Sequence, residues 1–173
     1  MLGLKRGTVK LIADHKKWKE LFEKEKKTLL SIFEDLEIQI EHVGSTAIPG
    51  VLAKPIIDMM LGFSKPEQTE IIYKKLEELG YEDRGERGVP GRRLFVKGPE
   101  EKRTHYLHVT KIDNSFWQEH IIFRDYLRQN QKGRDEYNKL KQDLAEKFSD
   151  KRELYTKAKS DFIQNIINKA RTP

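Results

Sequence analysis

Residues 41–58, with the sequence EHVGSTAIPGVLAKPIID, constrain this chain more than any other part of it. The pattern predicts a strand, a Gly44-Ser45 turn that opens a short helix, and a second, apolar strand that carries Asp58. Small residues at such a turn allow backbone N–H groups to approach an anion closely. An acid inside an apolar strand is costly to bury unless a metal or a strong hydrogen-bond donor accompanies it. The stretch therefore outlines a site for phosphoryl or nucleotidyl transfer.

The turn supplies three candidate phosphate-binding residues, Gly44, Ser45 and Thr46. On this interpretation the backbone amides and the Ser45 hydroxyl, which is also a candidate catalytic group, hold phosphate oxygens. An ordinary turn in which Ser45 caps the following helix explains the same residues, because serine is a common N-cap. The turn is not a Walker loop, since no lysine follows the glycine at that spacing.

Asp58 is the candidate catalytic acid and metal ligand. Strand alternation places it on one face with Ile56 and Met60. An acid between such neighbours is expected to have a partner, and buried acids are often functional. That partner is either a metal ion or a basic side chain such as Lys54, which would make Asp58 half of a structural ion pair.

Two histidines lie on a strand expected at 104–110. His108 shares a face with Tyr106, whereas His105 lies on the more apolar face. The polar face makes His108 the better candidate for catalysis and metal binding, and His42 is a third histidine expected near the same sheet edge. The alternative for each of these histidines is a structural role in the fold without any part in a site.

The basic candidates for anion binding are Lys54, Arg92, Arg93, Lys97 and Arg103, of which the first three are the predicted anion-binding residues. Arginine binds phosphate through two parallel hydrogen bonds, and lysine binds it as a point charge. Arg92 and Arg93 follow a Gly- and Pro-rich loop at 82–91, which suits a lid over an anion. They suit an exposed edge strand equally well.

Composition narrows the class of protein. The chain has 173 residues, of which 36% are hydrophobic and 36% charged, and a net charge of +6, which favours anionic partners. The absence of cysteine excludes disulfides, thiolate metal sites and cysteine catalysis. No run approaches the ~18 apolar residues of a membrane span, and the N-terminus lacks the apolar segment of a secretory signal. We therefore expect a cytoplasmic protein with no membrane partner.

The hydrophobic periodicity predicts an α+β fold. We expect helices at 14–36, 66–79, 115–129, 135–148 and 151–170, and strands at 37–43, 55–61, 92–97 and 104–110. Asp14 and Asp150 are the expected N-caps of the first and last helices, and Gly80 is expected to end the second. A chain of this length fits a single domain, 1–173, with an α+β body at 1–113 and a helical extension at 114–173.

With these residues in place, the chain resembles the GrpB family, which is grouped with the DNA-polymerase-beta-like nucleotidyltransferases. The resemblance runs from about residue 14 to residue 167. It rests on residues 41–58, 79–81, 90–98, 103–109 and 123–128. It continues through Tyr137, Leu140, Lys141, Leu144, Ala145, Tyr155, Lys159 and Phe162.

The resemblance implies a nucleotidyltransferase fold, a mixed sheet backed by helices, in which Gly44-Ser45 is the Gly-Ser motif and Asp58 the first strand-borne acid. Active members use two acids on one strand and a third on a neighbouring strand to bind two divalent metals, magnesium or manganese. Here Met60 stands where the second acid would be, and the neighbouring strand offers His108. Magnesium prefers oxygen ligands, whereas imidazole suits zinc, manganese or nickel. The metal set, for which Asp58, His108 and His42 are the candidates, is therefore incomplete.

Three functions remain open. The first is a nucleotidyltransferase-like protein that binds a nucleotide or small phosphorylated molecule and transfers a nucleotidyl group with a divalent metal. The second is a binding module on the same scaffold without the chemistry, which Met60 favours. The third is nucleic-acid binding through the helices after Asn114, which their interleaved acids disfavour. The basic residues of that region are Arg124, Arg128, Lys132, Arg134, Lys139, Lys141, Lys157 and Lys159.

Overall fold

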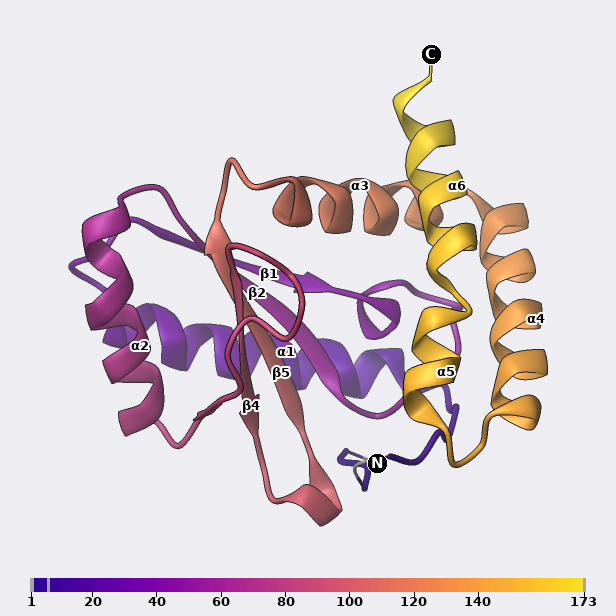
Figure 1. Ribbon diagram of the computed structural model, residues 1–173, viewed down its shortest axis with the longest axis horizontal. Coiled ribbons are helices and arrows are strands. Elements are labelled where there is room, and N and C mark those ends of the chain that lie inside the picture. Colours follow the sequence, from indigo (N-terminus) through magenta and orange to yellow (C-terminus); the bar gives the residue numbers. More distant parts are fainter. Residues whose placement is uncertain (1, 6, 173) are drawn as a thin grey trace.

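A five-stranded mixed sheet forms the centre of the protein (Figure 1), as seen in a computed structural model that describes residues 2–5 and 7–172. The strands are β1 (Ile38–Val43), β2 (Ile57–Phe63), β3 (Glu82–Asp83), β4 (Arg92–Lys97) and β5 (His105–Lys111). Their order is β1-β2-β5-β4-β3. The β2–β5 pair is parallel and the other pairs are antiparallel. The expected α+β class with a mixed sheet backed by helices is confirmed.

Helices cover both faces of the sheet and extend beyond one end of it (Figure 1). They are α1 (His15–Ile32), α2 (Thr69–Glu78), α3 (Ser115–Gln129), α4 (Gln131–Lys147), α5 (Arg152–Lys157) and α6 (Ser160–Arg171). Short 3-10 turns occupy Ser45–Ala47, Pro66–Gln68 and Glu100–Lys102. Among the described residues, no helix is long and apolar enough to cross a membrane.

One face of the sheet, here called the α1–α2 face, carries the main apolar core. Alternation along β2 turns Ile57, Met59 and Leu61 toward this face, and all three are fully buried. Neighbouring strands add residues such as Phe95, and α1 adds residues such as Leu29 at helical spacing. The alternating pattern read from the sequence therefore decides which side of each strand is dry.

The opposite face, here called the cavity face, carries Asp58, Met60 and Gly62 of β2. Helix α3 packs over the far half of this face, where Trp117 meets Met60. A Cβ atom at Gly62 would lie 2.6 Å from Trp117 Cζ3, so glycine is required for this close packing. The half of the face around Asp58 is left for the C-terminal helices.

The C-terminal helices form a second cluster with the segment that follows the Ser45–Ala47 turn. Ile48 and Val51 of that segment are fully buried against Leu127 of α3, Tyr137 of α4 and Ile166 of α6. Burial of such side chains is the main stabilising term in packing of this kind. It fixes α4 and α6 beside the turn, and so brings their side chains, and those of the short α5 that connects them, toward Asp58.

Several helix boundaries differ from the expectations, for local reasons. Helix α1 ends at Ile32 rather than residue 36. Helix α4 begins at Gln131 rather than residue 135, because the Asn130 side chain caps it by accepting a hydrogen bond from Gly133 N at 2.7 Å. The expected helix at 151–170 is two helices, since α5 closes with a bond from Lys159 N to Thr156 O before α6 begins.

The expected caps had mixed outcomes. Asp14 occupies the N-cap position of α1, although its side chain makes no capping hydrogen bond. The expectation for Asp150 was wrong, because the N-cap of α5 is Lys151 and no side chain caps it. Gly80 follows the last residue of α2 with φ of 79°, the left-handed conformation expected of a glycine that ends a helix.

Candidate functional site

A cavity of about 450 Å³ lies over the Asp58 half of the cavity face. The turn after β1 and the strands β2 and β5 form one wall, and side chains of α3, α4, α5 and α6 form the other. Six of the residues singled out from the sequence line it: Gly44, Ser45, Thr46, Lys54, Asp58 and His108. Other polar or charged groups of the lining are Tyr106, Glu119, His120, Tyr137, Lys141, Arg152, Tyr155, Thr156, Lys159, Ser160 and Gln164.

Gly44 lies directly against Asp58, because Val43 pairs with Asp58 across the β1–β2 ladder. A Cβ atom at Gly44 would lie 3.0 Å from Asp58 Oδ2. Gly44 has φ of 67° and ψ of −169°, a conformation that is essentially restricted to glycine. The Gly44 turn and the acid therefore meet at one point of the cavity wall, which no other residue type at position 44 would permit without strain.

Ser45 connects this wall to α4. Lys141 Nζ donates hydrogen bonds to Ser45 Oγ, at 3.2 Å, and to Leu52 O. Burial raises the pKa of Tyr137 to about 12, although a hydrogen bond with Ser45 opposes that shift. The N-cap of the short turn is Gly44, so Ser45 is not the capping residue, the alternative considered from the sequence. Its hydroxyl instead has neighbours on α4.

Four cationic side chains converge on the cavity: Lys54, Lys141, Arg152 and Lys159. Lys54 Nζ and Lys159 Nζ lie 5.7 and 4.5 Å from the centre of the Tyr155 ring, a distance at which the ring face attracts a cation. None of the four makes an ion pair within 4.0 Å to an acid of the described residues. The cavity thus holds a surplus of positive charge.

Crowding of these cations changes their protonation. Burial, with the charges of Arg152 and Lys159 adding to it, lowers the pKa of Lys54 to about 7. Burial beside Lys159 and Lys54 lowers the pKa of Lys141 to about 6. Burial lowers the pKa of Lys159 to about 8, with Asp58 opposing the shift. The lysines are therefore held partly neutral near pH 7, a state that an added anion would reverse.

Asp58 is the acid of this group. Burial raises the pKa of its carboxyl group, and the charges of Lys54, Arg152 and Lys159 oppose that rise. Its carboxylate makes neither a hydrogen bond nor an ion pair within 4.0 Å to another described residue. Asp58 is therefore not a closed structural ion pair, the alternative considered from the sequence, and it faces the open cavity.

His108 lies deeper on the same face, because β5 pairs it with Met60 rather than with Asp58. Its ring is 5.3 Å from Phe116 and 6.1 Å from His120. Burial, together with the nearby charges of His120 and Arg92, lowers its pKa well below the usual value. His108 is therefore a neutral imidazole at pH 7.

The structure places three other candidates away from the cavity. His42 pairs with Met59 and so lies on the α1–α2 face, where it stacks on Phe22 and contacts Thr46 Oγ1 at 2.9 Å. The expectation that it joins Asp58 and His108 is corrected here, because alternation along β1 points it to the other side. Burial among positive charges lowers its pKa to about 3.

The two arginines of β4 also diverge. Arg93 faces the α1–α2 side, where it binds Asp83 through two nitrogens at 2.7 Å. Arg92 is buried at the far end of the cavity face, 5.3 Å from the Phe116 ring centre. Neither lines the cavity, so the expected pair of arginines over one anion is not formed.

The side chains around Asp58 do not fit a pair of divalent metals. Met60 is fully buried and offers no hard oxygen ligand. Glu41, the acid that β1 places opposite Met60, is held by Arg124, and Glu119 pairs with Arg171. Within residues 2–5 and 7–172, no group of three His, Cys, Asp or Glu side chains could hold an ion. Cations surround the remaining carboxylate, which favours an anionic ligand over a dication.

Analysis of the sequence missed most of the cavity wall formed by the C-terminal helices. Arg152, Tyr155 and Lys159 stand three and four residues apart, which on helices places them on one side. That spacing was the available signal, and the family resemblance had already pointed to Tyr155 and Lys159. Lys141 also lies in the stretch that resembles the family, but its spacing gave no sign of a cavity position, because a lysine on an amphipathic helix normally faces solvent.

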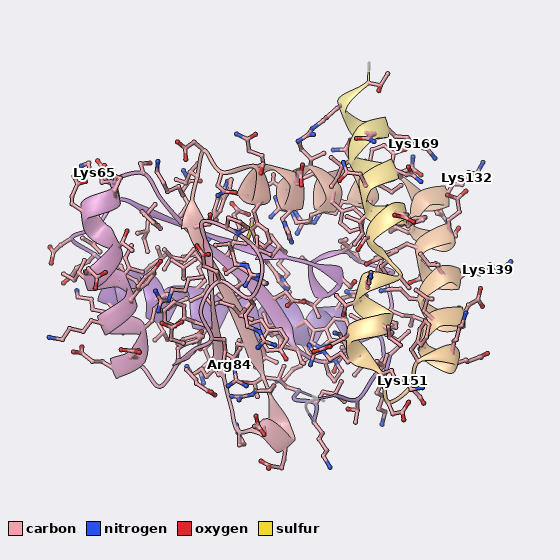
Figure 2. The ribbon with its side chains drawn as sticks, viewed as in Figure 1. Lys65, Arg84, Lys132, Lys139, Lys151 and Lys169 are labelled. Atoms are coloured by element: carbon pink, nitrogen blue, oxygen red, sulfur yellow. The ribbon has the colours of Figure 1, made fainter. Side chains whose placement is uncertain are left out.

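The basic residues after Asn114 do not form one surface. Lys141 and Lys159 face the cavity, and Arg124 is buried against Glu41. Lys132 and Lys139 project from the opposite side of α4, away from the sheet (Figure 2). A phosphate track for a nucleic acid would need such residues on one face.

Comparison with solved structures assigns the fold. A crystal structure of the Cid1 poly(U) polymerase with MgGTP bound is similar to this chain with a TM-score of 0.54 at 12% identity, over 79% of this chain and 44% of the polymerase. At that identity the likeness concerns the fold alone. The protein therefore has a nucleotidyltransferase-like fold.

The family is assigned by closer relatives. The chain belongs to the GrpB family. The model of this family, described as "GrpB protein", matches residues 8–169. It is 38% identical to the glutamate-rich protein GrpB of Alkalihalophilus pseudofirmus, over 97% of this chain and 99% of that protein. It is 37% identical to the UPF0157 protein YqkA of Bacillus subtilis over 94% of this chain, which spans 47% of YqkA. The crystal structure of conserved protein GrpB from Enterococcus faecalis matches with a TM-score of 0.81 and 36% identity, covering 93% and 95% of the two chains.

Proposed function

We propose that this protein binds a nucleotide or another small phosphorylated molecule in the cavity over Asp58. The observation that supports the proposal is a set of four cations, Lys54, Lys141, Arg152 and Lys159, that have no ion-pair partner among residues 2–5 and 7–172. Gathering like charges in a half-buried space is unfavourable unless an anion compensates them. A phosphate chain supplies several charged oxygens for such a group.

The lining of the cavity suits a ligand that has both an anionic and an apolar part. Val43, Phe123, Ile163 and Ile167 line it together with the cationic side chains. Its volume of about 450 Å³ lies within the usual range for small-molecule sites, roughly 300–1,000 Å³. We propose that the phosphates lie by Gly44, Ser45 and the lysines, and that the organic part of the ligand packs against the apolar side chains of α3 and α6.

The proposal predicts that ligand binding is accompanied by uptake of protons. A bound phosphate favours the charged form of Lys54 and Lys141, whose pKa values of about 7 and about 6 lie near neutrality. Binding at pH 7.5 should therefore take up protons from the buffer. Calorimetric titrations in two buffers of different ionisation enthalpy measure this uptake directly.

The main test is calorimetric titration with ATP, GTP, CTP, UTP and pyrophosphate, without added metal. The double variant Lys54→Met/Lys159→Met should lose at least about tenfold in affinity, which is ~1.4 kcal/mol. Lys139→Met is the matched control, because Lys139 is exposed on the outer side of α4 (Figure 2) and should bind like the parent. Failure of the parent to bind any of these probes, or equal binding by the double variant, would falsify the proposal.

Turnover is the second candidate. The Asp58 carboxylate beside Gly44 favours it, because this group has no ion-pair partner in the described part of the chain. A carboxylate at that point could orient or deprotonate an attacking hydroxyl. Nucleotide turnover should then disappear in Asp58→Asn, while calorimetric binding of the nucleotide remains. Binding without turnover, in the presence of either Mg²⁺ or Mn²⁺, would instead leave a binding module on the nucleotidyltransferase scaffold.

A further inference from the structure

A second, open groove adjoins the cavity. It has a volume of about 510 Å³ and lies between the α5–α6 junction, the loop after β3, and the outer part of β4. It shares four lining residues with the cavity, namely Tyr106, Arg152, Thr156 and Ser160. The two spaces are therefore neighbours along one wall, with a common boundary at Arg152.

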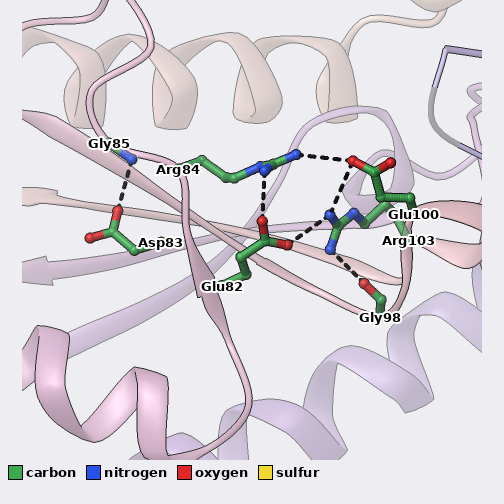
Figure 3. A network of polar contacts seen from close by, with 7 residues as sticks. All are labelled: Glu82, Asp83, Arg84, Gly85, Gly98, Glu100 and Arg103. Atoms are coloured by element: carbon green, nitrogen blue, oxygen red, sulfur yellow. Dashed lines mark hydrogen bonds and ion pairs between the residues drawn. The ribbon is translucent and has the colours of Figure 1, made fainter.

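The groove is basic, and part of that charge is already neutralised. Its lining includes Arg84 and Arg103, which share the acids Glu82 and Glu100 in one network (Figure 3). Arg103 Nη1 also donates to Gly98 O at 2.5 Å. These contacts hold the floor of the groove rigid and leave little net charge there.

The remaining cations of the groove are Arg87, Arg152 and Lys157. None of them makes an ion pair within 4.0 Å to an acid of the residues that the structure describes. Glu153 is the acid that lines the groove beside them, so positive charge remains in excess. The Arg152 guanidinium carbon lies 5.0 Å from the centre of the Tyr106 ring, which holds the arginine on the boundary between the two spaces.

The backbone at Arg87 adds an independent observation. Arg87 has φ of 48°, a left-handed conformation that is uncommon for a long side chain and costs of order 1 kcal/mol. Such conformations cluster at ligand-binding positions, where the placement of the side chain matters. The loop thus holds a strained arginine at the edge of a basic groove.

From these observations we propose that the groove is a second phosphate-binding subsite, which takes a phosphate monoester while a nucleotide occupies the cavity. The inference rests on the proposed function, because it assigns the cavity to the first anion. Arg152 lies between the two anions and contacts the space of each. The second phosphate belongs either to a separate phosphorylated molecule or to the distal end of one long ligand.

Two probes distinguish these sources. Ribose 5-phosphate, titrated into protein saturated with ATP, reports a separate molecule. Diadenosine pentaphosphate, compared with ATP, reports one ligand that spans both spaces. At least one of them should bind: ribose 5-phosphate in the presence of ATP, or diadenosine pentaphosphate at least about tenfold more tightly than ATP.

The groove variant is Arg87→Asn/Lys157→Gln, in which asparagine tolerates the left-handed backbone. It should weaken the successful probe by at least about tenfold while ATP binding stays at the parent value. Lys132→Gln/Lys139→Gln, on the outer side of α4, is the matched control and should change neither. The subsite is overturned if ATP binds but neither probe behaves as stated, or if the groove variant binds the successful probe like the parent. Loss of ATP binding by the parent would instead overturn the proposed function itself.

Discussion

The two faces of the sheet differ in whether their charged side chains form ion pairs. On the α1–α2 face, charged side chains at the margin are paired: Lys97 binds Glu25 at 2.8 Å, and Arg93 binds Asp83. On the cavity face, Lys54, Lys159 and the acid Asp58 face a common space and make no such contact with any residue that the structure describes. An ion pair stabilises the folded state, whereas like charges close together destabilise it. The charges of the first face therefore contribute to folding. The second retains an electrostatic cost that a ligand can remove.

The largest expected effect is a loss of stability from a substitution in the main apolar core of the α1–α2 face. Phe95 is fully buried on the α1–α2 face. Phe95→Ala should lower the free energy of unfolding by ~3–5 kcal/mol, through lost burial and the cavity left behind. Urea unfolding measures this loss. Below the unfolding transition the variant should still bind nucleotide like the parent, and weakened binding there would contradict the separation of the two faces.

A pair of glycine variants compares the turn with a helix end. Gly44 and Gly80 both have positive φ, but a Cβ atom at Gly80 meets nothing within 4 Å, whereas at Gly44 it meets Asp58. Gly80→Ala should cost ~1 kcal/mol, and Gly44→Ala ~2–3 kcal/mol, because it adds backbone strain and contact with the acid. Thermal and urea unfolding give both values. Nucleotide binding should fall only in Gly44→Ala, and equal behaviour of the two variants would contradict the close approach.

The same lysine substitution should have opposite effects on the two faces. Lys97→Met removes the ion-pair partner of the Glu25 carboxylate and should lower the free energy of unfolding by ~1–3 kcal/mol. Lys54→Met removes one of several crowded cations and should leave stability unchanged or raise it by up to ~1 kcal/mol. Urea unfolding and nucleotide titration of each variant check this. A Lys54→Met protein as destabilised as Lys97→Met would show that Lys54 stabilises the fold.

The last prediction is a pH dependence of stability, which is measured as a slope and not as a single loss. In the folded protein the pKa values of Lys54, Lys141 and Lys159 are about 7, about 6 and about 8, below the unfolded value of ~10.4. Between pH 8 and pH 10 the unfolded chain therefore binds more protons, so stability rises with pH and falls as pH drops toward these folded values.

The slope is set by the number of such groups, at up to roughly 1.4 kcal/mol per pH unit for each. Urea unfolding at pH 8, 9 and 9.5 measures it, and Lys54→Met should reduce it. Lys139→Met is the control, since Lys139 is exposed. An unchanged slope in Lys54→Met would mean that Lys54 is not held neutral by its surroundings.

Local sequence signals determined much of the fold. Alternation in β2 determined which of its residues enter the main apolar core. The strand β4 and the helix α3 have the bounds expected from the sequence, because short-range periodicity and turn residues determine such elements. The Gly44 turn and Asp58 were expected to meet, and they do so because β1 and β2 follow each other in the chain and pair directly, Val43 with Asp58.

Only the tertiary structure decided what surrounds Asp58. The register of β1 sent His42 to the other face, and alternation in β4 sent Arg93 there too, because a one-residue step inverts a side chain. The packing of α4 and α6 against the segment after the Ser45–Ala47 turn brought Lys141, Arg152 and Lys159 into the cavity from positions about a hundred residues away. Such long-range contacts depend on how apolar faces fit together, which periodicity within each helix does not specify.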